Sequence, residues 1–149
     1  MPRLDIVTDI VIDAGAERVW GVLTDFASYP EWNPMIRRAS GELAPGRRLE
    51  LHFEPAGQKG RDFKPKLLVV ERGRELRWRG NPGFPGVFDS EHYFVLEPRD
   101  GQATHLVQGM DCRGLAVPLM AKWADKTSRG PFEEMNRALK VRAEGAPGA

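Results

Sequence analysis

The stretch LAVPLMAKWADKTSRGPFEEMNRALKVRAE, residues 115–144, has the apolar period of an amphipathic helix and decides the fold. At 1.5 Å per residue such a helix is about 40 Å long. Small residues at its middle, including Thr127, Ser128 and Gly130, predict that a sheet packed on it leaves a cavity there, and Pro131 predicts a kink or break near Gly130. The predicted inward face carries Leu119, Met120, Trp123, Thr127, Gly130, Met135, Ala138, Leu139 and Arg142.

The charge and the cysteine and histidine content exclude several classes of function. The 149 residues include 22 Lys and Arg and 21 Asp and Glu, a net charge of +1, so no strong field attracts nucleic acid. Cys112 is the single cysteine, and His52, His92 and His105 are too far apart in sequence for a local metal motif. We therefore expect a cytoplasmic protein with no metal, no cofactor and no nucleic-acid partner.

We also expect a single domain over residues 1–143 that does not insert into a membrane. Its densest apolar run, residues 114–121, is far shorter than the roughly 20 residues that a membrane span needs. Acidic residues at Asp5, Asp9 and Asp13 are unlike a secretory signal. The tail, residues 144–149, is rich in Gly, Ala and Pro and is predicted to be disordered.

Before the long helix, the pattern predicts one strand, two short helices and six strands. Residues 4–12 alternate with period two, and residues 16–23 follow helical spacing after a possible cap at Asp13. Ser28 and Glu31, which are spaced like a capping box, and Pro30 predict a second short helix that Asn33-Pro34 ends. The later strands are predicted at 35–42, 48–54, 63–71, 75–79, 87–97 and 103–113. This order predicts an α+β fold in which an antiparallel sheet of about six to seven strands curls around the C-terminal helix.

Several short motifs resemble the SRPBCC superfamily, in its polyketide cyclase/dehydrase-like branch. The N-terminal motifs are Asp13-Ala14, ERVW at 17–20, LTDF at 23–26 and YPEWNP at 29–34, and later ones are LRWRG at 76–80, EHYF at 91–94 and FEEMNRALK at 132–140. The resemblance implies the helix-grip fold shared with lipid-transfer START domains and the birch-pollen allergen. It also implies binding of sterols, phospholipids, hormones, quinones or polyketide intermediates, with catalysis in only a minority of members.

Apolar side chains on the predicted inner faces are the candidate ligand-binding residues, since aromatic rings and adaptable methionines line many small-molecule sites. Ordinary core packing is the alternative at each position. The loop at 81–86 and the segment at 29–34 are candidate entrances to the cavity. The set is Trp32, Phe53, Trp78, Phe84, Phe88, His92, Phe94, Met110, Met120, Trp123 and Met135.

His92 is the one ionisable residue predicted to face inward, because it shares a strand face with Phe88 and Phe94. It would orient a ligand or act as an acid or base, or else be a structural histidine satisfied by its neighbours. Strand parity places Asp111 on the other face and disfavours a catalytic pair. His52 and His105 are predicted to be exposed.

Two functions follow, and the first is favoured. One is the binding of a small hydrophobic or amphipathic ligand, such as a lipid, a quinone or an aromatic or polyketide-like metabolite, between the sheet and the helix. The other is a polyketide cyclase/dehydratase-type enzyme with His92 as acid/base. The sequence contains no Gly-x-Ser-x-Gly elbow, phosphate-binding loop or dinucleotide fingerprint, and nothing in it favours a protein-interaction module.

Overall fold

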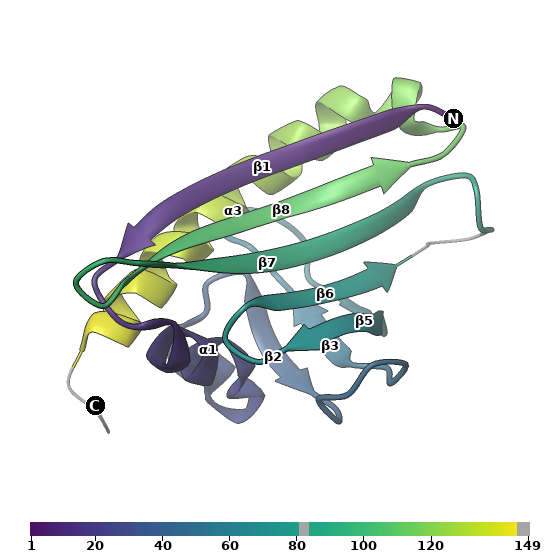
Figure 1. Cartoon of the computed structure of the whole chain (residues 1–149). Helices are drawn as coiled ribbons and strands as arrows, with labels where there is room; N and C mark the ends of the chain where they lie inside the picture. Colours follow the sequence, from purple (N-terminus) through teal and green to yellow (C-terminus); the bar gives the residue numbers. More distant parts are fainter. Residues whose placement is uncertain (81–83, 146–149) are drawn as a thin grey trace.

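The computed structural model describes residues 1–80 and 84–145, and it contains two antiparallel sheets and one long helix (Figure 1). The larger sheet has the strand order β1-β8-β7-β6-β5, and the smaller has the order β2-β3-β4. The predicted α+β helix-grip architecture is confirmed. The elements are β1 (Arg3–Ile12), α1 (Ala16–Thr24), the 3-10 turn η1 (Phe26–Ser28), α2 (Tyr29–Trp32), β2 (Ile36–Ser40), β3 (Glu50–Phe53), β4 (Arg61–Phe63), β5 (Lys66–Glu71), β6 (Glu75–Gly80), β7 (Asp89–Arg99), β8 (Ala103–Arg113) and α3 (Val117–Glu144).

The predicted strand over residues 63–71 is two strands in different sheets. Pro65 has no backbone N–H, so it cannot continue a ladder, and the chain passes there from the smaller sheet to the larger one. β4 pairs with β3, whereas β5 pairs with β6. The strands therefore divide between two sheets instead of forming one continuous meander.

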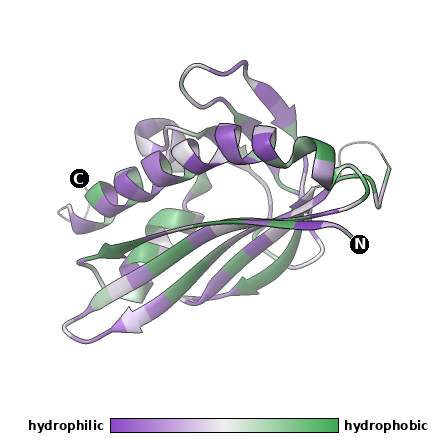
Figure 2. Ribbon diagram, turned by 90° about the horizontal axis from the view of Figure 1, so that it is seen from above, coloured by the Kyte–Doolittle hydropathy of each residue, from purple (hydrophilic) through white to green (hydrophobic). Residues whose placement is uncertain are grey.

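Helix α3 lies across one face of the larger sheet, and hydrophobic and hydrophilic residues alternate along the strands beneath it (Figure 2). The helix is rotated about its own axis relative to the predicted orientation. Leu119 is 89% exposed and Trp123 is 54% exposed, although both were predicted to face inward. At about 100° per residue, Leu119 lies roughly 200° from the buried Val117, almost on the opposite side. The buried face is instead Val117, Ala124, Ser128, Phe132, Met135, Asn136, Leu139 and Ala143.

Pro131 lies inside α3, yet the helix continues through it, so the predicted break is wrong. A proline leaves the carbonyl four residues earlier without its helical donor, and here that carbonyl belongs to Thr127. The side-chain Nε2 of Gln58, in the loop between β3 and β4, donates to the Thr127 carbonyl oxygen at 2.9 Å. The missing helical hydrogen bond is replaced by one that fastens this loop to α3.

The C-terminal end of α3 is joined to the end of β1 through Glu144, the last residue of the helix. Its Oε2 accepts a hydrogen bond from the backbone N–H of Asp13 at 2.7 Å, and it pairs with Lys140. Asp13 does not cap α1 as predicted, because Gly15 occupies the cap position. The predicted tail therefore begins after Glu144, and residues 146–149 lie outside the described residues. Within the described part of the chain, no helix is long and apolar enough to cross a membrane.

A pair of leucines on α3 tests which face of the helix is buried. We expect Leu139→Ala to lower the free energy of unfolding by about 3 to 5 kcal/mol, because Leu139 is fully buried. The matched Leu119→Ala, at an 89% exposed position, should change it by no more than about 0.5 kcal/mol. Urea denaturation measures both values, and a larger loss for Leu119→Ala would contradict the assigned orientation.

Candidate functional site

A cavity of about 600 Å³ lies between α3, the larger sheet and the β3–β4 edge of the smaller sheet. Its size is within the range of small-molecule sites. Small side chains on α3, including Ala124 and Ser128, line it, as the small-residue middle of the helix predicted. Seven of the eleven candidate residues line the cavity, and these are Phe53, Trp78, Phe88, His92, Met110, Met120 and Trp123.

The other four candidates lie outside the cavity. Phe84 is 80% exposed in the turn before β7, where no second layer covers it. Phe94 and Met135 are fully buried in the packed core. Trp32 packs edge-on against Tyr29, with ring centroids 5.3 Å apart. Phe94 and Met135 show that the predicted inner face extends beyond the cavity into solid core, whereas Phe84 lies on the surface.

His92 lies at the boundary between that core and the cavity. Its imidazole stacks on Phe94, with centroids 5.0 Å apart, and contacts Trp78 and Phe132 at 5.0 and 4.7 Å. Strand alternation on β7 turns it inward, as the sequence predicted. Three aromatic rings therefore fix the plane of the imidazole.

A chain of buried hydrogen bonds fixes which ring nitrogen of His92 carries the proton. The Asn136 Nδ2 donates to Thr8 Oγ1 at 2.9 Å, and the Asn136 Oδ1 accepts from Gln108 Nε2 at 2.7 Å. The remaining amide oxygen of Gln108 lies 2.9 Å from His92 Nε2. Since this oxygen can only accept, His92 Nε2 carries the hydrogen. In the neutral ring, Nδ1 is then an acceptor, and among the described residues it has no hydrogen-bond partner.

Burial lowers the pKa of His92 to about 4, with the hydrogen bond to Gln108 opposing the shift. The imidazole is therefore neutral at pH 7. Its one ring N–H hydrogen is on Nε2 and is donated to Gln108, and the low pKa makes the ring a weak general base. His92 lines the cavity, and its Nδ1 remains as a hydrogen-bond acceptor. A neutral acceptor in an apolar wall favours ligand orientation over proton transfer.

The other ionisable candidates do not join His92. Asp111 lies on the outer face of β8, where it pairs with Arg3 at 3.1 Å and with Arg113 at 3.1 Å, as strand parity predicted. His52 and His105 are partly buried instead of fully exposed, and each lies between two carboxylates. In the part of the chain that the structure describes, no group of three His, Cys, Asp or Glu residues is placed to hold a metal.

Sequence reasoning missed the loop between β3 and β4, which supplies Gln58 and Lys59 to the cavity lining, and Arg61 at the start of β4, which also lines it. The two glycines at positions 57 and 60 mark a tight loop, but its position over α3 depends on the hydrogen bond to Thr127. Among the described residues, neither 29–34 nor 84–86 of the predicted entrance segments lines the cavity. The segment at 29–34 packs elsewhere, and residues 81–83 of the other lie outside the described residues.

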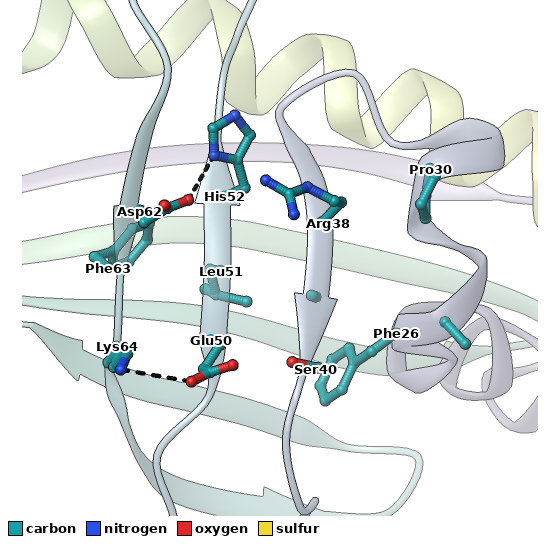
Figure 3. Close-up of a pocket in the computed structure, with 12 residues that line it drawn as sticks. Phe26, Pro30, Arg38, Ser40, Glu50, Leu51, His52, Asp62, Phe63 and Lys64 are labelled. Carbon is teal, nitrogen blue, oxygen red and sulfur yellow. Dashed lines mark hydrogen bonds and ion pairs between the residues drawn. The ribbon is translucent and has the colours of Figure 1, made fainter.

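A second depression, of about 470 Å³, lies on the outer side of the smaller sheet (Figure 3). Its charged groups are largely paired with one another: His52 Nδ1 is 2.6 Å from Asp62, and Lys64 Nζ is 3.5 Å from Glu50. Hydrogen bonds to Glu54 and Asp62 raise the pKa of His52. The depression is smaller, and most of its charged groups pair with one another, so the cavity under α3 is the stronger candidate site.

The fold and the cavity define a helix-grip protein with an internal cavity. Residues 3–144 match the family described as polyketide cyclase / dehydrase and lipid transport, and the chain belongs to this family. The family match and the structural neighbours confirm the SRPBCC resemblance. No curated protein matches the chain.

Three solved structures illustrate the similarity. The Zhui aromatase/cyclase from Streptomyces sp. R1128 is 20% identical, with 99% of each chain covered and a TM-score of 0.70. A START superfamily protein from Mycobacterium smegmatis is 27% identical, with 94% of this chain and 97% of that chain covered and a TM-score of 0.69. Norcoclaurine synthase from Thalictrum flavum is 15% identical, with 97% and 96% covered and a TM-score of 0.72. The chain spans about half the length of the di-domain aromatase/cyclases BexL and StfQ.

The pKa of His92 predicts a pH dependence of stability. The unfolded chain binds a proton at the histidine below about pH 6.5, whereas the folded chain does so only near pH 4. Stability should therefore fall as the pH drops from 6.5 to 4, by about 3 kcal/mol at about 1.4 kcal/mol per unit of pKa. In His92→Gln this fall in the free energy of unfolding should be absent. Urea denaturation between pH 7 and 4.5 measures the difference, and parallel profiles would show that His92 is not buried in its neutral form.

The contact between Gln58 and Thr127 predicts a coupling with Pro131. Gln58→Glu keeps the side-chain size but removes the donor, so we expect a loss of about 1 kcal/mol and faster amide hydrogen exchange in residues 54–60. Pro131→Ala restores a backbone N–H for the Thr127 carbonyl. The Gln58→Glu change should therefore cost less in that background, and a double-mutant cycle measures the coupling. Strictly additive effects would argue against the replacement hydrogen bond.

Proposed function

We propose that this protein binds a small hydrophobic or amphipathic molecule, such as a lipid, a quinone or an aromatic or polyketide-like metabolite, inside the cavity under α3. The cavity carries the proposal. It is large enough for such a molecule, and its walls combine aromatic and Met side chains with basic and uncharged polar ones, as an amphipathic ligand requires. The proposed ligand contacts are the seven cavity-lining candidates, and the single buried cysteine, Cys112, is consistent with a cytoplasmic location.

The hydrogen-bonding capacity of His92 narrows the class of ligand. With Nε2 donating to Gln108, Nδ1 is left to accept a hydrogen bond from a ligand hydroxyl or N–H. A ligand with such a donor would satisfy an otherwise unpaired nitrogen at the inner end of an apolar site. A hydroxylated or phenolic apolar molecule therefore fits better than a pure hydrocarbon.

A second candidate function is that of a polyketide cyclase/dehydratase-type enzyme. The family description includes cyclases and dehydrases, and the hydrogen-bond chain through Gln108 and Asn136 orients His92 as an active site would require. The low pKa of His92 and the lack of a charged partner beside it favour binding without catalysis.

Native mass spectrometry with solvent extraction of the bound material tests both candidates. We expect gently purified protein to retain an apolar molecule, and Ser128→Phe, which fills the cavity from α3, to lose it while remaining folded. Retention by Ser128→Phe equal to that of the wild type would contradict binding in this cavity. A converted product with wild type, replaced by its unchanged precursor with His92→Gln, would instead support the enzyme.

A further inference from the structure

We infer that the cavity binds an amphipathic carboxylate, whose apolar body lies under α3 and whose carboxylate lies at the basic rim formed by Arg48, Lys59, Arg61 and Lys64. This inference rests on the proposed binding function and specifies the ligand class. Four cationic residues line the cavity, and no Asp or Glu is among its described lining residues. The chain as a whole has a net charge of only +1, so this separation of charge is local.

Strand alternation separates the basic residue on the cavity side of β4 from the acidic residue beside it. On β4, Arg61 and Phe63 are two residues apart and both line the cavity. Asp62, between them, lines the outer depression and pairs with His52 (Figure 3). The carboxylate that is nearest in sequence is therefore directed away from the cavity. Asp62 and His52 neutralise each other on the outer side.

Arg61 is the best-placed cation of the rim. Its guanidinium carbon lies 5.3 Å from the centroid of the Phe53 ring and 5.7 Å from that of the Phe63 ring, and both rings line the cavity. Cation–π contacts of this kind fix the guanidinium without using its hydrogen-bond donors or neutralising its charge. Among residues 1–80 and 84–145 it has no ion-pair partner, so its planar donor group is free to bind a carboxylate through two parallel hydrogen bonds.

The other three basic residues of the rim add positive charge near Arg61. Arg48 donates from Nη1 to the backbone oxygen of Lys64 at 2.8 Å, which holds its guanidinium beside β4 without a carboxylate partner in the described chain. Lys64 is partly neutralised by Glu50 at 3.5 Å. Lys59, beside the anchored Gln58, completes the rim from the β3–β4 loop. The polar end of a ligand would therefore face fixed positive charge, while its other end reaches His92.

Two fluorescent probes with the same aromatic body separate the inference from the proposed function. The probes are 4-(1-pyrenyl)butyrate, which carries the carboxylate, and 1-pyrenebutanol, which replaces it with a neutral hydroxyl. In fluorescence titrations at low salt we expect the butyrate to bind roughly tenfold more tightly, as a charge-assisted hydrogen-bond pair provides. Raising the salt concentration should reduce this preference, because the rim is exposed to solvent.

Arg61→Gln should remove most of the preference for the butyrate over the alcohol. Arg72→Gln is the matched control, because Arg72 is an exposed arginine that pairs with Glu17 away from the cavity, and its change should leave both affinities as in the wild type. Equal affinities of the wild type for the two probes, or a preference that survives in Arg61→Gln combined with Lys59→Gln, would overturn the carboxylate inference alone. If neither probe binds, both the proposed binding of aromatic ligands and the carboxylate inference fail.

Discussion

The buried hydrogen-bond chain from Thr8 through Asn136 and Gln108 to His92 is the constraint on which the rest of the structure depends. It joins β1, β8, β7 and α3, so it sets how the long helix lies on the sheet. Each polar group in it would be costly to bury alone, and together they satisfy one another. This hydrogen-bond chain also reaches the edge of the packed core, because its last member, His92, lines the cavity. The same network therefore positions the helix and supplies the polar feature of the site.

The cavity persists because small side chains of α3 face it. Ala124 and Ser128 occupy the buried face of α3 where bulky residues would fill the space, and Trp123 lines the cavity while remaining half exposed. Gln58 fastens the β3–β4 loop over this region through the carbonyl that Pro131 leaves free. A proline that would ordinarily destabilise a helix thus provides an acceptor for a loop at the cavity. An apolar interior, a neutral acceptor at one end and basic residues at the other favour an amphipathic ligand.

The sequence predicted the fold and the inward orientation of His92, because both follow from periodicity along the chain. Residues Phe88 to Leu96 alternate, and the long helix has no other apolar partner than the sheet. The orientation of Leu119 was predicted wrongly, and Trp123 lines the cavity while half exposed, because the hydrophobic pattern does not show that small residues of α3 approach the sheet most closely. Phe94 and Met135 share an inner face with true cavity residues, and periodicity cannot separate a cavity wall from solid core. The parts played by Gln58 and Arg61 depend on tertiary contacts with Thr127 and with two aromatic rings, which local patterns do not contain.

The most direct test of this account is the protonation state of the His92 ring, measured from its ¹⁵N NMR signals at pH 7 with and without a hydroxylated apolar ligand. The account predicts a neutral ring with the hydrogen on Nε2 and an unprotonated Nδ1, whose signal shifts when 1-pyrenebutanol is added and shifts less with the methyl ether of the same probe. A charged ring, a hydrogen on Nδ1, or binding of the alcohol that leaves the Nδ1 signal unchanged would contradict it.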